Sequence, residues 1–214
     1  MLFRDREDAA RRLAEGLGRY RGRHPLILAV PRGAVLMGRV LADALEGELD
    51  VVLVHKLGAP GNPELAVGSV TEDGTVTVSP FAWEIGVTQE YVDREAADQL
   101  ALLRERRRRY TPIREPADPS GRVVIVVDDG VATGATLLAA LRGLRKRDPT
   151  ELVAAIAVAP PATLERIQAE ADRVVCLASP EPFLAVGQFF RSFPQVSDDE
   201  VVGTLEQEAA KAPA

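Results

Sequence analysis

The chain has 214 residues, of which 46% are hydrophobic and 27% are charged. These fractions are ordinary for a soluble globular protein and exclude a disordered chain, a collagen-like chain and a disulfide scaffold. The net charge of −6 argues against broad adhesion to nucleic acid or to anionic membranes, so we expect neither as a partner. The single cysteine, the start without a signal-peptide pattern and the absence of an apolar run of about 20 residues predict a cytoplasmic protein.

Short apolar runs alternate with amphipathic stretches along the chain. The apolar runs predict strands that are covered on both faces, because they lack polar alternation. In chain order we expect strands at 26–30, 51–54, 123–127, 152–159 and 173–178. The helices are expected at about 4–20, 34–45, 88–110, 134–147 and 162–171. Strand followed by helix, repeated, predicts an α/β fold with a Rossmann-like parallel sheet flanked by helices, in a single domain over residues 1–214.

Two segments interrupt this alternation. The first, at about 56–88, alternates polar and apolar residues around an Asp73-Gly74 pair, which predicts a β-hairpin. Connections of this length are often lids, so we expect a hairpin lid there. The second, at about 179–205, is rich in phenylalanine. It is either a small hood over an aromatic substrate, built together with the N-terminal segment, or ordinary edge packing, and the sequence leaves both open.

The most informative stretch is VVIVVDDGVATGAT, at 123–136. An apolar strand ends in two carboxylates, Asp128 and Asp129, and a turn rich in glycine and threonine leads into a helix near Gly134. Ligands of open α/β sheets bind beyond the carboxyl ends of the strands, and a helix N-terminus is suited to phosphate. A P-loop is excluded because Ala135 stands where its lysine is required. A phosphate cradle beside two carboxylates predicts a sugar phosphate as ligand.

The stretch DDGVATGAT resembles the phosphoribosyl-pyrophosphate (PRPP) motif of the type I phosphoribosyltransferases. The resemblance implies that Asp128 and Asp129 contact the ribose hydroxyls as the catalytic acidic pair. It also implies that the 5′-phosphate is held by the residues that follow, namely Ala132, Thr133, Gly134, Ala135 and Thr136. In family members that use 6-oxopurines, an acidic residue usually occupies the place of Ala132, which argues against hypoxanthine or guanine as the acceptor.

Two further segments gain roles from this resemblance. The loop after the first strand resembles the family's pyrophosphate-binding loop, which often includes a strained peptide bond; its residues are Pro31, Arg32, Gly33 and Ala34. Arg32 would add charge there, and Gly33 would supply unusual backbone angles. Lys56, at the end of the next predicted strand, resembles the basic residue at the base of the family's flexible loop. The remaining alternative for the 31–34 loop is a simple strand-to-helix turn with an exposed arginine.

The resulting hypothesis is a Mg²⁺-dependent phosphoribosyltransferase acting on PRPP and a nitrogenous base or nucleotide. We expect few direct protein ligands to the metal, with Asp128 and Asp129 reaching it through water. The alternatives are a regulatory protein that binds PRPP or a nucleotide without turnover, and a hydrolase of a phosphorylated sugar. The arginine-rich run at 104–109 is interpreted as a solvated helix face, and His24 and His55 are given no role. A homodimer remains open, and the sequence does not identify the acceptor base.

Overall fold

A parallel five-stranded sheet forms the centre of the computed structural model. The structure describes residues 1–111 and 116–211, except for the side chains of residues 63 and 64. The spatial order of its strands is β2 (Glu48–Val51), β1 (Leu26–Ala29), β6 (Val123–Asp128), β7 (Glu151–Val158) and β8 (Arg173–Ala178). All neighbouring pairs are parallel. The predicted α/β fold with a Rossmann-like sheet is therefore confirmed.

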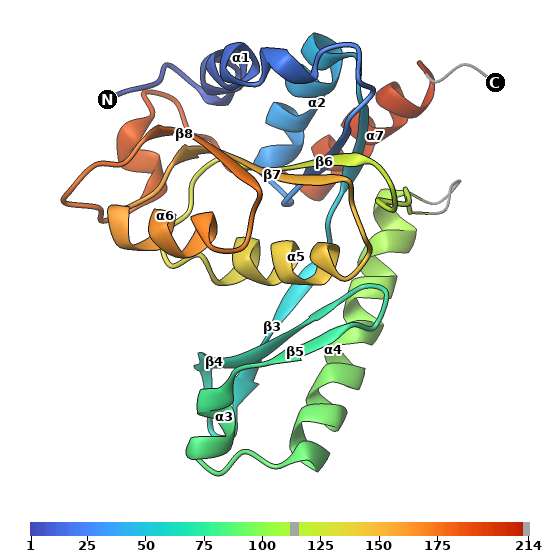
Figure 1. Cartoon of the computed structure of the whole chain (residues 1–214), viewed down its shortest axis with the longest axis vertical. Coiled ribbons are helices and arrows are strands. Elements are labelled where there is room, and N and C mark those ends of the chain that lie inside the picture. Colours follow the sequence, from blue (N-terminus) through green and yellow to red (C-terminus); the bar gives the residue numbers. More distant parts are fainter. Residues whose placement is uncertain (112–115, 212–214) are drawn as a thin grey trace.

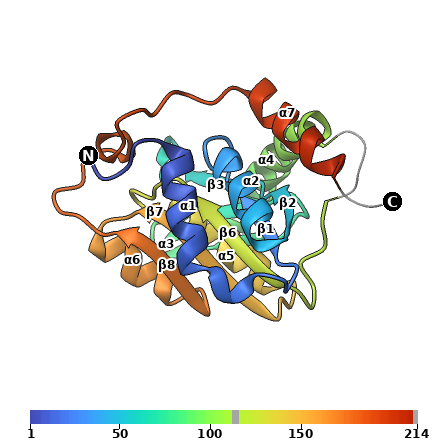
Figure 2. The same ribbon diagram turned by 90° about the horizontal axis from the view of Figure 1, so that it is seen from above.

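Helices cover both faces of this sheet (Figures 1 and 2). On one face lie α1 (Arg6–Gly16) and α2 (Ala34–Leu45), and on the other lie α5 (Ala135–Arg145) and α6 (Pro161–Gln168). Successive residues of a strand point to opposite faces, so Ile27 joins the core under α1 and α2 whereas Leu28 joins the core under α5. This two-sided burial explains why the strand sequences are continuous apolar runs.

The predicted strand at 51–54 is wrong in its boundaries. The structure divides this apolar run between two sheets: β2 ends at Val51, Val52 and Leu53 connect, and β3 (Val54–Ala59) begins a second sheet. The run stays apolar because the connecting residues are also buried, at 6% and 1% exposure. As a result, Lys56 does not follow a strand of the parallel sheet; it lies within β3, opposite Ser69 of the neighbouring strand.

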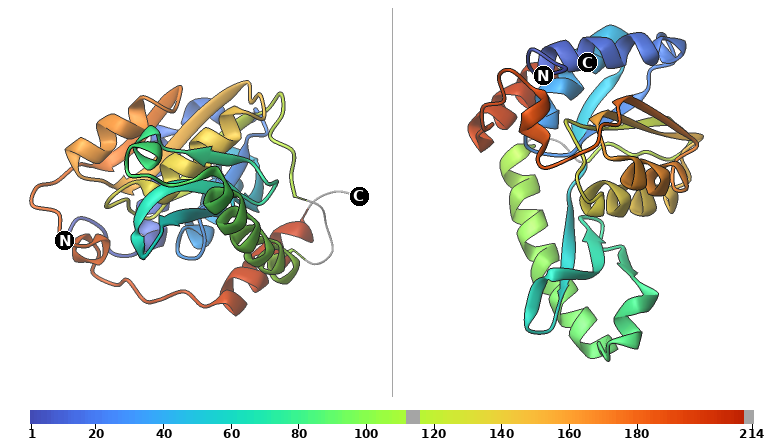
Figure 3. Two further views of the ribbon diagram at one scale, coloured as in Figure 1. Left: turned by 90° about the horizontal axis from the view of Figure 1, so that it is seen from below. Right: turned by 90° about the vertical axis from the view of Figure 1, so that its left-hand side faces the viewer.

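The segment after β3 forms the predicted hairpin. Strands β4 (Asn62–Thr71) and β5 (Val76–Val78) pair antiparallel around the Asp73-Gly74 turn, where Gly74 takes a φ of +88°. Short helix α3 (Pro80–Glu84) and long helix α4 (Gln89–Tyr110) follow. Figures 1 and 3 show this small sheet and the first half of α4 standing away from the parallel sheet, beyond α5. The hairpin is confirmed, and its action as a lid stays a prediction.

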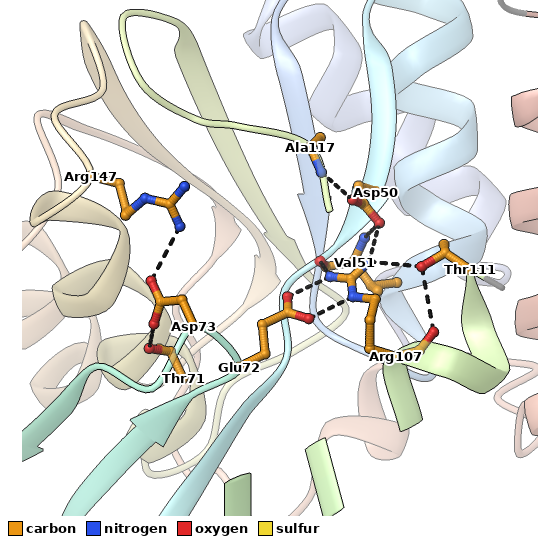
Figure 4. A network of polar contacts seen from close by, with 9 residues as sticks. All are labelled: Asp50, Val51, Thr71, Glu72, Asp73, Arg107, Thr111, Ala117 and Arg147. Carbon is orange, nitrogen blue, oxygen red and sulfur yellow. Dashed lines mark hydrogen bonds and ion pairs between the residues drawn. The ribbon is translucent and has the colours of Figure 1, made fainter. Parts of the chain in front are cut away.

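A buried ion network joins the base of this insertion to the parallel sheet (Figure 4). Arg107 of α4 donates from Nη1 to Asp50 Oδ1 at 2.7 Å, from Nη2 to Val51 O at 2.8 Å, and from Nε and Nη2 to the carboxylate of Glu72. Arg107 and Asp50 are 8% and 1% exposed. The interpretation of 104–109 as a solvated face is therefore wrong for Arg107, although Arg104, Arg106 and Arg108 are exposed.

Burial and ion pairing act in opposite directions in this network. Burial alone would lower the pKa of Arg107, but its hydrogen bonds and charge interactions with Glu72 and Asp50 outweigh that effect and leave the pKa raised. Burial raises the pKa of Glu72 despite its ion pair. The network therefore carries a large desolvation cost that is offset only while its partners are all present.

The N-terminal segment lies beside the segment that follows β8 (Figure 2). From β8 the chain passes through a short 3₁₀ turn, η2 (Val186–Phe189), to α7 (Asp198–Ala209), which packs beside α2; another 3₁₀ turn, η1 (Gly18–Tyr20), follows α1. Phe3 forms a bridge with Phe190, and their rings lie 5.1 Å apart. The N-terminal and phenylalanine-rich segments are thus neighbours, as the hood interpretation requires. None of the helices described here is long and apolar enough to cross a membrane.

Candidate functional site

The loops that follow β1 and β6 lie side by side at the carboxyl edge of the sheet. Ala29 and Val127 are opposite each other near the ends of the two strands, so both loops leave the sheet at the same level. A Cβ atom on Gly33 would lie 2.1 Å from Asp129 Oδ2. The structure thus brings the predicted 31–34 loop against the acidic pair. Lys56, by contrast, lies in the small antiparallel sheet.

Glycine is required at position 33 because there is no room for a side chain, and not because of its backbone angles. Its φ of −57° and ψ of −39° are helical, and it serves as the N-cap of α2, so the expected unusual angles at this glycine are wrong. Any larger residue would overlap the carboxylate of Asp129 and the guanidinium of Arg6, whose Nε lies 2.8 Å from the same Cβ position. The peptide bond between Pro31 and Arg32, immediately before it, is cis.

The two carboxylates of the site differ in their surroundings. Burial and the neighbouring Asp129 raise the pKa of Asp128 well above its usual value. Burial also raises the pKa of Asp129, against the hydrogen bond and positive charge of Arg6. Two carboxyl groups held together away from water therefore favour a state with fewer than two negative charges. Carboxyl groups with such raised pKa values are concentrated at functional sites.

Arg6 is the site residue that the sequence reasoning missed. It donates from Nε to Asp129 Oδ2 at 2.7 Å, and the two side chains are only 9% and 15% exposed. A signal was present: Arg6 precedes Ala9, Ala10 and Leu13, the buried positions of α1, at helical spacing. A charged residue on the apolar stripe of a helix indicates a buried partner, although nothing in the sequence identifies that partner as Asp129.

The loop from Gly130 to Thr136 ends in an open helix N-terminus. Gly134, at a φ of +80°, is the N-cap of α5; no side chain caps this end and the first turn carries no acidic residue. The loop is held from behind by α6: Thr163 Oγ1 donates to Ala132 O at 2.7 Å, and Arg166 Nη1 donates to Thr133 O at 3.1 Å. The N-terminus of α5 and the positive end of its dipole are therefore left without a side-chain cap, an arrangement suited to an anion.

An open hollow of about 700 Å³ links this loop to the phenylalanine-rich segment. It is lined by Ala132, Thr133, Pro160, Glu181, Pro182 and Phe183. The Phe183 ring lines the hollow and packs on Phe189 at 5.0 Å, whereas Phe189 and Phe190 are buried in the core. Each of the two interpretations of this segment therefore holds for different residues: Phe189 and Phe190 are packing residues, and Phe183 is available to a ligand.

A cavity of about 290 Å³ lies between β3, α4 and the start of α7. It is lined by His55, Leu102, Leu103, Glu105, Arg106, Arg109 and Asp198. A hydrogen bond from Tyr110 lowers the pKa of Asp198, and the positive charges of Arg109 and Arg32 add to this effect. Arg32 therefore lies within electrostatic range of Asp198, and His55, which was given no role, lines the same cavity.

This geometry agrees with the comparisons with known proteins. The family model of the phosphoribosyl transferase domain matches residues 3–189. The chain belongs to this family. A Mycobacterium tuberculosis protein, provisionally named as a phosphoribosyl transferase, is 40% identical over 211 residues, which is 96% of this chain and 47% of that protein. The chain therefore spans about half the length of the curated relatives it matches.

A solved structure has the same fold over nearly the whole chain. The crystal structure of TT1426 from Thermus thermophilus superposes with a TM-score of 0.88 at 45% sequence identity. The match covers 97% of this chain and 99% of that one. The small antiparallel sheet and the phenylalanine-rich segment are therefore parts of an architecture that a relative shares.

The acidic pair of this domain should lower its stability at neutral pH. The raised pKa of Asp128 means that the folded protein binds this proton more tightly than the unfolded chain. The protonated Asp128 carboxyl therefore stabilises the folded state below pH 3.8, and this stabilisation is lost as the pH rises through the folded-state pKa. We expect Asp128→Asn to raise the Tm at pH 7.5, because each unit of pKa shift corresponds to about 1.4 kcal/mol.

The measurement is thermal unfolding of wild type and Asp128→Asn at pH 7.5 and near pH 4. The advantage of the variant should shrink at the lower pH, where the wild-type carboxyl is protonated. Asp118→Asn, at an exposed position whose carboxylate pairs with Arg147, serves as a control that should not gain stability at either pH. A variant less stable than wild type at pH 7.5 would mean that the ionised pair supports the fold.

Proposed function

We propose that this phosphoribosyl transferase domain transfers a phosphoribosyl group between PRPP and a nitrogenous base, with pyrophosphate as the other product or substrate. The observation that carries the proposal is the 128–136 loop. It presents two adjacent carboxylates and the open N-terminus of α5 from a single turn at the carboxyl edge of the sheet. A sugar phosphate with a free diol suits both features of this loop: its hydroxyls match the carboxylates, and its phosphate matches the helix N-terminus.

In this proposal the segment from Ala132 to Thr136 binds the 5′-phosphate. The backbone amides at the start of α5 donate to the phosphate oxygens, and the exposed hydroxyls of Thr133 and Thr136 add donors. The contacts from Thr163 and Arg166 fix the loop from its far side without occupying its amides. The same loop directs the ribose toward Asp128 and Asp129, whose oxygens accept hydrogen bonds from the 2′ and 3′ hydroxyls.

The pyrophosphate group is assigned to the loop from Pro31 to Ala34. This loop lies against Asp129 through Gly33, and this contact supports its assignment to the ribose side of the site. Arg32 is exposed and supplies positive charge. Lys56, in the small sheet, is proposed to approach the pyrophosphate when the insertion closes over the site as a lid.

The residues present fit a magnesium ion. Carboxylate oxygens are the donors that Mg²⁺ prefers, and this ion is usually held by one or two carboxylates, water and substrate phosphates. Asp128 and Asp129 are the residues that would hold it, through water. When bound, the ion would neutralise charge on the leaving pyrophosphate.

The contribution of the protein to the reaction is mainly positioning. The 128–136 loop holds the phosphate and the ribose hydroxyls, so the C1 atom and the incoming base meet in a fixed orientation. Donors of the 31–34 loop stabilise negative charge that develops on pyrophosphate as the bond at C1 breaks. The base is assigned to the hollow beside Phe183, whose ring offers a stacking surface.

The test is to incubate the protein with PRPP, Mg²⁺ and single bases while pyrophosphate release is measured. The panel includes adenine, uracil, orotate, hypoxanthine and guanine. Base-dependent release, with hypoxanthine and guanine as poor acceptors, is the expected result. Binding of PRPP without release would support a regulatory protein, and release of phosphate without any base would support a hydrolase.

A further inference from the structure

We propose that Arg6 is a positioning residue that couples the ribose-binding acid to the phenylalanine-rich hood. This inference rests on the proposed function and adds to it a residue from outside the recognised motif. One guanidinium, on the first residue of α1, contacts Asp129 on one side and the segment around Phe193 and Pro194 on the other. The position of the hood and the orientation of the acid are thereby made interdependent.

On the acid side, Arg6 and Gly33 together fix the Asp129 carboxylate. Arg6 Nε holds Oδ2 at 2.7 Å, and the space beside that oxygen is closed by the backbone of Gly33. A charge-assisted hydrogen bond of this length in a nearly dry setting restricts the carboxylate to one orientation. In this proposal the other oxygen, Oδ1, is the acceptor for the ribose hydroxyls.

On the hood side, the same guanidinium is held by two contacts. The Arg6 Cζ atom lies 3.7 Å from the centre of the Phe193 ring, and Nη1 donates to Pro194 O at 2.7 Å. The Phe193 ring packs on Phe190 at 4.7 Å, and Phe190 packs on Phe3. This chain of rings ties the hood to the N-terminal segment, so displacement of the hood would pull Arg6 away from Asp129.

The contacts predict how variants of Arg6 behave. Loss of a hydrogen bond between charged groups corresponds to a decrease in affinity of about 10- to 100-fold, so we expect Arg6→Gln to weaken PRPP binding in that range. Arg6→Lys keeps the charge but cannot make the flat stacking contact and two directed hydrogen bonds at once, so it should restore the affinity only in part. Phe193→Leu leaves the ion pair in place and removes the stack, and a smaller loss of about 3- to 10-fold is expected.

The experiment measures PRPP affinity by calorimetry in the presence of Mg²⁺ for wild type, Arg6→Gln, Arg6→Lys, Phe193→Leu and Arg11→Gln. Arg11 is the matched control, because it lies on the same helix, pairs with Glu7 and has a side chain that is 64% exposed. Its variant should bind as wild type does. A purely structural role for Arg6 would lower the Tm of Arg6→Gln and leave the affinity of its folded fraction unchanged.

A double-mutant cycle separates action through Asp129 from other effects. In an Asp129→Asn background, Arg6→Gln should cause little further loss of PRPP affinity, since the group that Arg6 orients is already altered. Full additivity of the two changes would overturn the inference, as would wild-type affinity in Arg6→Gln. Wild-type affinity in Phe193→Leu would overturn the link to the hood. If wild-type protein itself fails to bind PRPP, the proposed function falls and the inference falls with it.

Discussion

Replacing Arg107 with methionine is expected to lower the free energy of unfolding by about 3–5 kcal/mol, because removing one partner of a buried ion pair leaves uncompensated charge. Asp50, at 1% exposure, would lose the guanidinium that pairs with it, while the donor Ala117 N at 2.9 Å would remain. Glu72 would lose both of its hydrogen bonds to the guanidinium. At about 2–4 °C per kcal/mol, the Tm should fall by roughly 6–20 °C.

The matched control for this prediction is Arg108→Met on the next position of the same helix, where the side chain is exposed. Its effect should remain within about 0.5 kcal/mol, as is usual for surface positions. Thermal unfolding of the two variants beside wild type gives the comparison. Equal, small decreases in the free energy of unfolding at both positions would show that the network contributes little to the attachment of the insertion.

Gly134→Ala is expected to weaken PRPP binding by at least about 10-fold, the effect of losing charge-assisted hydrogen bonds to the phosphate. Gly134 has a φ of +80°, a conformation that costs residues with a Cβ atom about 1–2 kcal/mol. The new Cβ would also lie 2.9 Å from Thr163 Cγ2, on the side chain that holds the Ala132 carbonyl. Relief of both effects requires the loop to move, which displaces its phosphate-binding amides.

Gly203→Ala is a suitable control for this substitution, because Gly203 lies in α7 and a Cβ there meets no atom within 4 Å. Alanine in a helix interior should raise its stability by about 0.5–1 kcal/mol and leave ligand binding unchanged. The affinities are compared by calorimetry and the stabilities by thermal unfolding. Wild-type affinity in Gly134→Ala would argue that the phosphate binds elsewhere.

Features of the fold that arise from local patterns could be predicted from the sequence. The apolar runs identified β1, β6, β7 and β8, and the Asp73-Gly74 pair identified the turn between β4 and β5. The DDGVATGAT stretch located the acidic pair and the open N-terminus of α5, because strand, turn and helix follow one another there within a short window of sequence. The local residue types of these elements therefore agree with a single fold.

Features that depend on distant contacts could not be predicted. Arg6 and Asp129 are 123 positions apart, and Arg107 reaches Asp50 across 57 positions, so neither pair leaves a pattern in any short window. The division of the 51–54 run between two sheets was missed because Val52 and Leu53 are as apolar as strand residues yet only connect them. The need for glycine at position 33 arises from Asp129, which approaches it from the loop after β6.

The central claim, that the 128–136 loop binds PRPP, is tested most directly by titrating PRPP with Mg²⁺ into wild-type protein and Asp129→Asn in a calorimeter. The proposal predicts saturable binding of one PRPP per chain to wild type, and binding at least about 10-fold weaker to the variant, which lacks the charged acceptor for the ribose hydroxyls. Absence of binding to wild type, or equal affinity in the two proteins, would contradict it.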